Sequence, residues 1–352
     1  MQRIQYKDTL LLKGMVFAVL LGLSACGGGS SSERVPDVSQ VKVNLQTRRF
    51  DQDFVSIDSN HIGAGLEHLY GSYPEFLDFY LDTILAIGVM HHYTDSSVAV
   101  SRGVRSFLTY PDYRNLFDTI AVHFPDTRKT DEDLLKGFQY LQHYYPEFKI
   151  PRVIYFNSFL ANWGVVSYEG GIAIGLDMFL GRNFPFYISV GQPDYMLINF
   201  RPESIAPSVF NTIYFDFHPF RDEERTLLDM MIQKGKQQYF LEKMLPFVQP
   251  EDRIGYTPEQ LKWCEANEAM IYNFFAANNL LFEKNWSKMR RYVVYGPTTN
   301  GMPAESPGNI GTWLGYRIVK AFAKEHPEMT PEQIFATEQA DQFLKQSKYK
   351  PK

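Results

Sequence analysis

The sequence contains very little cysteine. Cys26 and Cys264 are the only two in 352 residues. If Cys26 is modified, Cys264 has no partner within the chain, so we expect no disulfide to support the fold. Cys264 follows Leu261 and Trp263 in an apolar context, which predicts a buried small hydrophobe rather than a reactive thiol. Stability must then come from an apolar core, and a composition that is 45% hydrophobic and 15% aromatic is sufficient to form one.

Long apolar runs and an excess of basic residues are also absent. After the N-terminal region, no run of about 18 apolar residues is long enough to cross a membrane as a helix. The formal net charge is −5 at pH 7, and removal of residues 1–25 (three cations, one anion) makes it −7. Proteins that bind nucleic acid usually carry a basic surface. We therefore expect no nucleic acid partner.

The N-terminus has the three parts of an export signal. Arg3, Lys7 and Lys13 precede an apolar run over residues 15–23, which leads into Leu23-Ser24-Ala25-Cys26. A cysteine after small residues predicts a lipoprotein signal that is cut before Cys26. Each buried methylene of the attached acyl chains contributes about 0.8 kcal/mol to membrane binding. An ordinary signal peptide with a chance cysteine is the alternative.

The remaining chain divides into a tether and one domain. Residues 26–40 include the sequence GGGSSS, which is typical of a flexible linker. Because no acidic run follows Cys26, we expect the body to face the periplasm. No change of composition divides residues 41–352, which predicts a single domain.

The patterns of apolar residues predict an α+β fold that is mostly helical. A strand is predicted from Val41 to about Phe54, and three more at 153–156, 164–168 and 172–176, the last two joined by a turn at 169–171. Helices are predicted over 73–90, from Thr130 to about 145, 202–217, 222–245, and from Thr257, Gly311 and Thr330 onward. We expect a small antiparallel sheet before a helical C-terminal half.

One segment offers the best cluster of a histidine with carboxylates. His218, Asp222 and Glu224 could contribute to a metal site. However, Pro219 interrupts the helical register, and an acidic stretch is also an ordinary helix start. His91 and His92 follow an apolar helix, where they suit its carbonyl end. Neither Ser167 nor Ser306 lies in a Gly-x-Ser-x-Gly motif, so a serine nucleophile is not indicated.

A long loop is the best candidate for contact with another molecule. Residues 296–311 are rich in Gly and Pro, lack a periodic pattern, and contain or adjoin Tyr295, Met302, Glu305 and Asn309. Loops of this length in compact domains are often functional. A packed irregular loop is the alternative. The lysines at the C-terminus predict a solvated tail, with docking on an acidic partner or headgroup as the other possibility.

The C-terminal part contains several segments that together resemble a known family. They are LLDMMIQKGK at 227–236, IGYT at 254–257, LKWC at 261–264, GMPAESPG at 301–308, IGTWLG at 310–315 and SKYKPK at 347–352. These resemble the gliding-motility-associated lipoproteins GldB of Bacteroidetes-type bacteria, and the lipoprotein signal fits. The resemblance implies a cell-envelope lipoprotein that is linked to gliding motility and to type IX secretion.

A more distant resemblance concerns mechanism. The order of hairpin and helices, with Leu227-Leu228-Asp229 and the segment 311–319, is similar to predicted zinc proteases of the HExxH class. Such enzymes need two imidazoles one helical turn apart and a glutamate base. Residues 202–217 contain no histidine, HExxH occurs nowhere, and Lys234 stands where those proteins have an acid. The resemblance implies a degenerate zincin-like scaffold, a pseudoenzyme without a cofactor.

Two hypotheses of function follow. The first is a lipid-anchored envelope protein that acts by binding or assembly with other proteins of a gliding or secretion machine. The alternative is a lipid-anchored, metal-dependent hydrolase with non-standard ligands around His218. The missing HExxH motif favours the first hypothesis.

Overall fold

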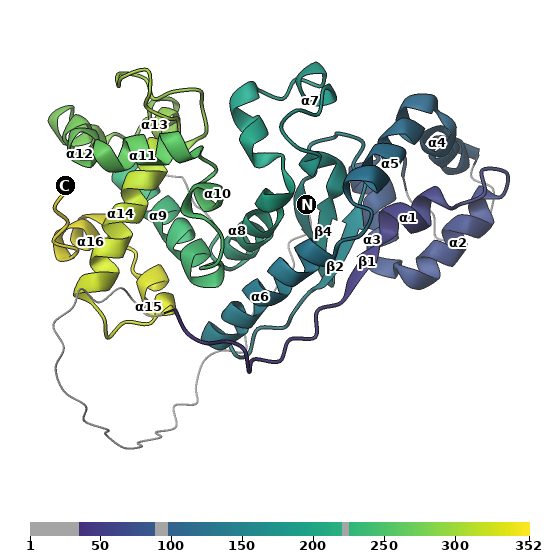
Figure 1. Cartoon of the computed structure of the whole chain (residues 1–352), viewed down its shortest axis with the longest axis horizontal. Helices are drawn as coiled ribbons and strands as arrows, with labels where there is room; N and C mark the ends of the chain where they lie inside the picture. Colours follow the sequence, from purple (N-terminus) through teal and green to yellow (C-terminus); the bar gives the residue numbers. More distant parts are fainter. Residues whose placement is uncertain (1–34, 89–97, 220–224) are drawn as a thin grey trace. The chain divides into compact units, whose positions relative to one another are not determined.

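A four-stranded mixed sheet packs against helices on both faces in this computed structural model, which describes residues 35–88, 98–219 and 225–352 (Figure 1). The strand order is β1-β2-β4-β3, with β1 (Thr47–Arg49), β2 (Arg152–Phe156), β3 (Val165–Tyr168) and β4 (Gly171–Gly175). β2 is parallel to both β1 and β4, and only β3 is antiparallel. The predicted antiparallel pairing is therefore confirmed for β3 and β4 and wrong for the other two pairs. A series of helices connects β1 to β2, which allows these two strands to run parallel. β3 lies on the outer side of β4 and not between β2 and β4, so β4 pairs with β2 directly and parallel to it.

Alternate residues of the strands belong to two different cores. Val153 and Tyr155 of β2 face a larger core, while Ile154 and Phe156 face a smaller core. Because side chains alternate across a strand, both faces of β2 must be apolar, which explains its continuous apolar sequence. The larger core continues among the C-terminal helices, and the smaller core is built mostly from residues 50–117.

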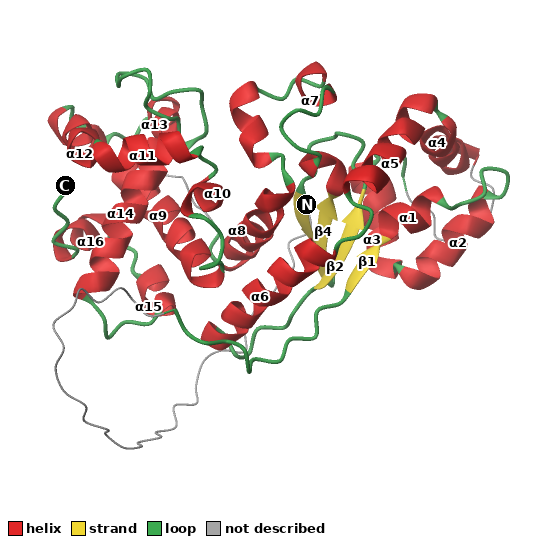
Figure 2. Cartoon of the chain, viewed as in Figure 1, coloured by secondary structure: helices red, strands yellow, loops and turns green. Residues whose placement is uncertain are grey.

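The smaller core is covered by the N-terminal helices (Figure 2). These are α1 (Phe50–Val55), α2 (Ile62–Ser72), α3 (Pro74–Phe79), the π-helix η1 (Tyr80–Ile84), α4 (Val98–Thr109) and α5 (Pro111–His123). Phe50 packs edge-on against Tyr73, Phe76 and Tyr80 at centroid distances of 4.8–5.1 Å. The rings of α1, α3, η1 and the residue between α2 and α3 thus form one cluster, which compensates for the small size of each helix.

The larger core is covered by the remaining helices. They are α6 (Arg128–Tyr144), η2 (Leu176–Phe179), α7 (Phe186–Ser189), η3 (Asp194–Asn199), η4 (Pro202–Ser204), α8 (Ile205–Phe217), α9 (Leu227–Met244), α10 (Pro250–Ile254), α11 (Pro258–Ala266), α12 (Glu268–Ala277), η5 (Leu280–Phe282), α13 (Trp286–Val293), α14 (Ile310–Glu325), α15 (Pro331–Ala336) and α16 (Ala340–Gln346). The α+β class and the helical C-terminal part are as predicted. None of the helices in the described ranges is long and apolar enough to span a membrane.

Helices α9 and α14 cross at very short range. A methyl group on Gly315 of α14 would overlap the carbonyl oxygen of Met231 in α9, and one on Gly235 of α9 would overlap the backbone of Gly315. Only glycine permits this approach, because any Cβ atom would force the helices apart. Gly235, in the middle of α9, and Gly315, in the second turn of α14, therefore determine how closely these two helices pack.

Several predicted boundaries are wrong. Residues 41–46 form no strand, β1 ends at Arg49, and α1 begins at Phe50 because Phe50 and Phe54, one turn apart, both enter the smaller core. The predicted helix over 73–90 divides into α3 and η1. Helix α6 begins at Arg128 rather than after Thr130, and α9 begins after Thr226, whose side chain forms a capping box with Asp229. The capping boxes at Thr257 and Thr330 are confirmed.

Contacts group the chain into residues 1–37 and a body that spans Val38–Lys352. Everything described below belongs to the second group.

Candidate functional site

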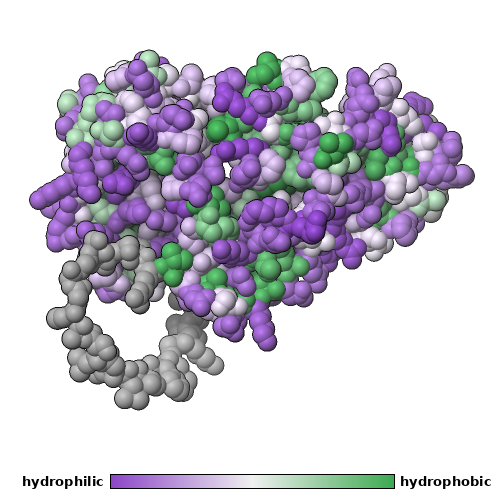
Figure 3. Space-filling model, viewed as in Figure 1, coloured by the Kyte–Doolittle hydropathy of each residue, from purple (hydrophilic) through white to green (hydrophobic). Residues whose placement is uncertain are grey.

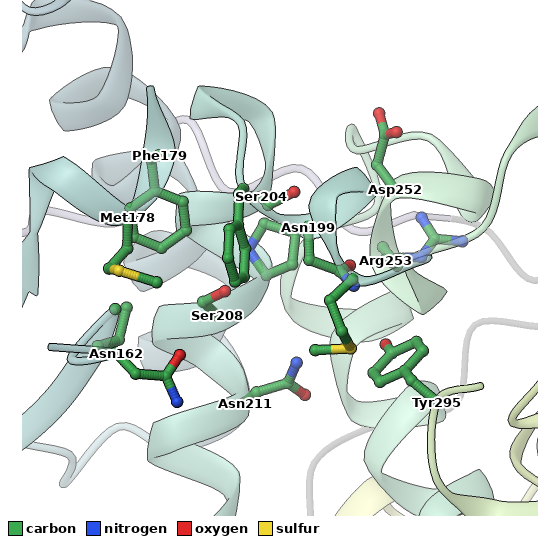
Figure 4. A pocket seen from close by; sticks show the side chains of 15 residues that line it. Asn162, Met178, Phe179, Asn199, Ser204, Ser208, Asn211, Asp252, Arg253 and Tyr295 are labelled. Atoms are coloured by element: carbon green, nitrogen blue, oxygen red, sulfur yellow. The ribbon is translucent and has the colours of Figure 1, made fainter. Parts of the chain in front are cut away.

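A cavity of about 230 Å³ opens where β3 begins (Figure 4). It is bounded by η4 and the first two turns of α8, by η2 and η3, by α10 and by Tyr295, which lies two residues after α13. Its lining residues are Asn162, Gly164, Val165, Met178, Phe179, Met196, Asn199, Phe200, Ser204, Pro207, Ser208, Asn211, Asp252, Arg253 and Tyr295. Methionine and phenylalanine side chains thus share the cavity wall with amides and hydroxyls.

Helix α8 supplies the polar wall. Ser204, Ser208 and Asn211 lie four and then three residues apart, which places them on one helical face. Ile205, Val209 and Ile213 on another face are buried in the larger core. The apolar face holds the helix against the sheet, and the polar face is thereby directed into the cavity.

Three asparagines bring amide groups to the cavity. The Asn211 side chain accepts a hydrogen bond from Gln237 Nε2 at 2.7 Å, and Asn162 accepts one from Gln192 Nε2 at 3.2 Å. Asn199 Nδ2 is buried and has no hydrogen-bond partner among the described residues. In Figure 4 these three amides lie around the same space, together with the ring of Tyr295. A buried donor without a partner costs free energy unless a ligand or water accepts its hydrogen bond.

The charged groups beside the cavity are paired or engaged. Asp252 forms an ion pair with Arg201. Burial raises the pKa of Asp252, and the Arg201 guanidinium opposes that increase. The Arg253 guanidinium donates to the carbonyl oxygens of Val248 (2.6 Å) and Leu245 (3.2 Å), beyond the end of α9. Tyr295 donates to Ile254 O at 2.8 Å, and burial raises its pKa to about 12. At neutral pH the cavity therefore presents mainly uncharged polar groups.

The predicted metal cluster is only partly described. His218 ends α8, and its ring packs on Tyr214 (4.9 Å) and Phe335 (5.6 Å). Burial lowers the pKa of His218. Asp222 and Glu224 lie outside the described residues, as do His91 and His92. Within the described ranges, no three His, Cys, Asp or Glu side chains are grouped so that they could hold a metal ion.

The two serines that were considered as nucleophiles lie in different environments. Ser306 is fully buried, and its hydroxyl is near Met302 Sδ (3.5 Å) and Pro307 O (3.4 Å). Ser167 lies on β3 and donates to Asp216 Oδ2 at 2.6 Å. Burial raises the pKa of Asp216, and the bond from Ser167 opposes the increase. The described contacts place no histidine beside either serine. Cys264 is buried, as predicted.

The loop between α13 and α14 has a packed base and an exposed tip. Thr299 donates to Pro307 O at 2.5 Å, Tyr256 donates to Gly308 O at 3.0 Å, and Asn309 is 5% exposed. Met302 is half-buried, while Glu305 is exposed at the tip. Of the four residues predicted for partner contact, Glu305 therefore faces solvent and Tyr295 faces the cavity.

The C-terminal tail follows the surface of the body. Tyr349 donates to Glu268 Oε1 at 2.7 Å, Lys348 pairs with Glu325 at 2.7 Å, and Lys352 O accepts from Ala269 N at 3.1 Å. The four terminal lysines (Lys345, Lys348, Lys350 and Lys352) are exposed.

A scan against family models matches residues 31–351 to "Gliding motility protein GldB". The chain belongs to the GldB family. The match covers nearly the whole sequence and confirms that part of the resemblance. No curated protein and no solved structure matches the chain. The likeness to zinc proteases gains no support from these comparisons.

Apart from Tyr295, the cavity residues of this GldB-family chain were not predicted from the sequence. Asn162, Asn199 and Arg253 come from segments that are far apart in the sequence, so no local motif joins them. A local signal was present at α8, where its N-cap Ser204 and the α8 residues Ser208 and Asn211 repeat at helical spacing in an apolar sequence.

Proposed function

We propose that this chain is a lipid-anchored cell-envelope protein that acts by binding other proteins of a gliding or type IX secretion machine. The family match carries the proposal, because it links the chain to gliding motility over nearly its whole length. The lipoprotein signal at Cys26 supports the membrane anchor, with the body in the periplasm.

The chemistry of the cavity favours binding over catalysis. Its described lining contains no histidine and no cysteine, and its one carboxylate, that of Asp252, is paired with Arg201. General acid–base or nucleophilic catalysis needs such a group within hydrogen-bond reach of the reacting atoms. Amides, hydroxyls and thioethers can instead hold a ligand without transforming it.

Exposed apolar side chains provide a surface for a partner. On and after α7, Phe186, Ile188 and Val190 are 58%, 55% and 47% exposed. Figure 3 shows a mostly hydrophilic face with several separate apolar areas. Clustered exposed apolar side chains often mark a protein interaction site.

The test is crosslinking in the native host combined with a secretion assay. A photoreactive residue replaces Glu305 at the loop tip in one strain and Val122, 77% exposed on α5, in the control strain. We expect Glu305 to capture envelope proteins more efficiently than Val122, and deletion of the gene to impair secretion of type IX cargo. Normal secretion after deletion, with equal crosslinking at both sites, would contradict the proposal.

Metal analysis of the full chain tests the alternative. Stoichiometric zinc that is lost in His218→Ala would favour the hydrolase with non-standard ligands and overturn the binding proposal.

A further inference from the structure

Among the described residues, strand β3 forms an edge of the sheet, and its own sequence lacks the usual protective residues. It pairs with β4 on one side only. Edge strands of native proteins commonly carry lysine, proline or a bulge that discourages pairing with another chain. β3 consists of Val165, Val166, Ser167 and Tyr168, and its first three residues are partly exposed. The edge therefore has the composition of a strand that can accept a further strand.

The register shows which backbone groups face outward. Tyr168 is paired with Gly171, Val166 with Ala173, and Gly175 N donates to Gly164 O at 2.9 Å. In an antiparallel pair, hydrogen-bonded residues alternate with residues whose N–H and C=O groups point away from the partner strand. The backbone N–H and C=O groups of Val165 and Ser167 therefore point away from β4. No hydrogen bond among the described residues uses their backbone groups on the outer side.

The cavity adjoins this edge on the α8 face of the sheet. Val165 lines the cavity and packs on the larger core, and Ser167 donates to Asp216 of α8 from the same face. An extended segment paired with β3 would place alternate side chains on this face, and the one beside Val165 would point into the cavity.

The size and polarity of the cavity define what enters it. At about 230 Å³ it is smaller than the roughly 300–1,000 Å³ of typical small-molecule sites, which suits one inserted side chain. The unpartnered Asn199 Nδ2 needs an acceptor, and the nearby charges are paired or engaged. A neutral side chain with an acceptor oxygen, such as that of Asn, Gln, Ser or Thr, fits these conditions.

We propose that an extended segment of a partner protein adds to the sheet along β3 and inserts one neutral, acceptor-bearing side chain into the cavity. This mode supplies main-chain hydrogen bonds for affinity and a side-chain pocket for selectivity. The inference rests on the proposed binding function and names the chemistry of the segment that is bound.

Proline at position 167 tests the backbone pairing. Because the Ser167 N–H points outward, Ser167→Pro removes a donor to the incoming strand but no hydrogen bond to β4. Ser167→Ala is the matched control, since it also loses the hydroxyl bond to Asp216 but keeps the N–H group. Short random peptides displayed on phage are selected against the full mature chain, and the affinity of the selected peptides is then measured.

We expect the selected peptides to share Asn, Gln, Ser or Thr at one position. Ser167→Pro should weaken their binding roughly tenfold, while Ser167→Ala changes it by less than about twofold. Equal affinity for wild type and both variants, or selection of no peptide, would overturn the inference.

Hydrogen exchange provides a readout that does not depend on variants. Bound peptide should slow exchange of the Val165 and Ser167 amides in the wild-type chain, whereas the Val166 amide, already paired with Ala173, should change less. Unchanged exchange at Val165 and Ser167 in the saturated complex would overturn the inference even if Ser167→Pro does not fold.

The two proposals fail in different ways. If Glu305 still captures envelope proteins and Ser167→Pro supports normal secretion and binds peptides, the strand addition is wrong and the binding function stands. If deletion of the gene leaves secretion intact and Glu305 captures no more than the control, the binding function is wrong whatever the peptides do.

Discussion

Asn199 holds an unsatisfied donor in the candidate site. Its Nδ2 atom is buried without a partner among the described residues. Leaving such a donor unpaired costs about 1–3 kcal/mol, whereas an apolar side chain of similar shape carries no such penalty. We therefore expect Asn199→Leu to leave the free energy of unfolding unchanged or to raise it, while binding of the selected peptides falls. Chemical denaturation and peptide titration measure the two effects.

Asn211 is the matched control for Asn199. Its side chain accepts a hydrogen bond from Gln237 Nε2 at 2.7 Å, and Gln237 is only 6% exposed. Asn211→Leu leaves the Gln237 amide without this partner, so it should lower the free energy of unfolding by about 1–3 kcal/mol. If both variants lose stability equally, Asn199 is satisfied in the free protein and its proposed role is wrong.

Lys236 is a buried cation without a carboxylate in direct contact. Its side chain is 3% exposed, and Nζ donates to Phe335 O at 3.2 Å and to Thr337 O at the end of α15. Burial lowers the pKa of Lys236 to about 8, and nearby Glu338 opposes this decrease. The carbonyl oxygens accept from the ammonium group but do not fully replace its lost hydration.

The lowered pKa of Lys236 predicts a pH dependence of stability. Below pH 8 the lysine is charged in both the folded and the unfolded chain. Between a pH of about 8 and the pKa of about 10.4 that a lysine has in the unfolded chain, the unfolded chain binds more protons than the folded chain. The free energy of unfolding therefore rises with pH in this range.

Lys236→Met should abolish that rise. From about pH 7.5 to about pH 9.5, the free energy of unfolding of wild type should increase relative to the variant by on the order of 1–2 kcal/mol. Denaturant titrations of both proteins across this range measure the difference, in which the shared titration of tyrosines cancels. Parallel pH profiles would show that Lys236 has an ordinary pKa.

At the scale of elements, the crossing of α9 and α14 depends on Gly315. Because a methyl group there would overlap Met231 O, Gly315→Ala must separate two helices whose faces are buried in the larger core. We expect the free energy of unfolding to fall by more than about 3 kcal/mol, or the protein to fail to fold. Thermal denaturation measures the loss.

Gly71 provides the control for that substitution. It lies in α2, is exposed, and has open space where a Cβ atom would be added. Gly71→Ala should therefore raise the free energy of unfolding by about 0.4–1 kcal/mol, because it restricts the unfolded chain. A similar effect of both substitutions would mean that the helix crossing tolerates a side chain at position 315.

Local signals predicted the elements better than their arrangement. The capping boxes at Thr257 and Thr330 were correct because each depends on four consecutive residues. The hairpin of β3 and β4 was found because its turn and both strands are contiguous. The parallel pairing of β1 with β2 could not be predicted from the sequence, because a series of helices lies between these two strands in the chain.

Tertiary packing also overrode local patterns. The alternation at Val41, Val43 and Leu45 indicated a strand, but these residues pack on the larger core without regular structure. The cavity shows the same limit, since β3, α8, α10 and Tyr295 of the loop after α13 each contribute side chains. From the sequence, only Tyr295 was named, and the helical spacing of Ser204, Ser208 and Asn211 was the other available signal.

At the scale of the whole molecule, the proposed function needs a folded body and a membrane anchor at separate places in the chain. The body spans Val38–Lys352, and the family match reaches from residue 31 to 351. Cys26 precedes both and lies outside the described residues. The sequence GGGSSS after Cys26 is typical of a linker, and a linker there would let the body reach partners near the membrane while the lipid holds it.

Substitution of Cys26 tests this separation. Cys26→Ala should remove palmitate labelling and release the protein from the membrane fraction, because the acyl chains supply the membrane affinity. The purified variant should bind the selected peptides as tightly as wild type, since position 26 lies outside the body. Cys264→Ala is the control, because this buried thiol should leave labelling and fractionation unchanged. Palmitate labelling that persists in Cys26→Ala would show that the lipid is attached elsewhere, and the tethered binding protein proposed here would need another anchor.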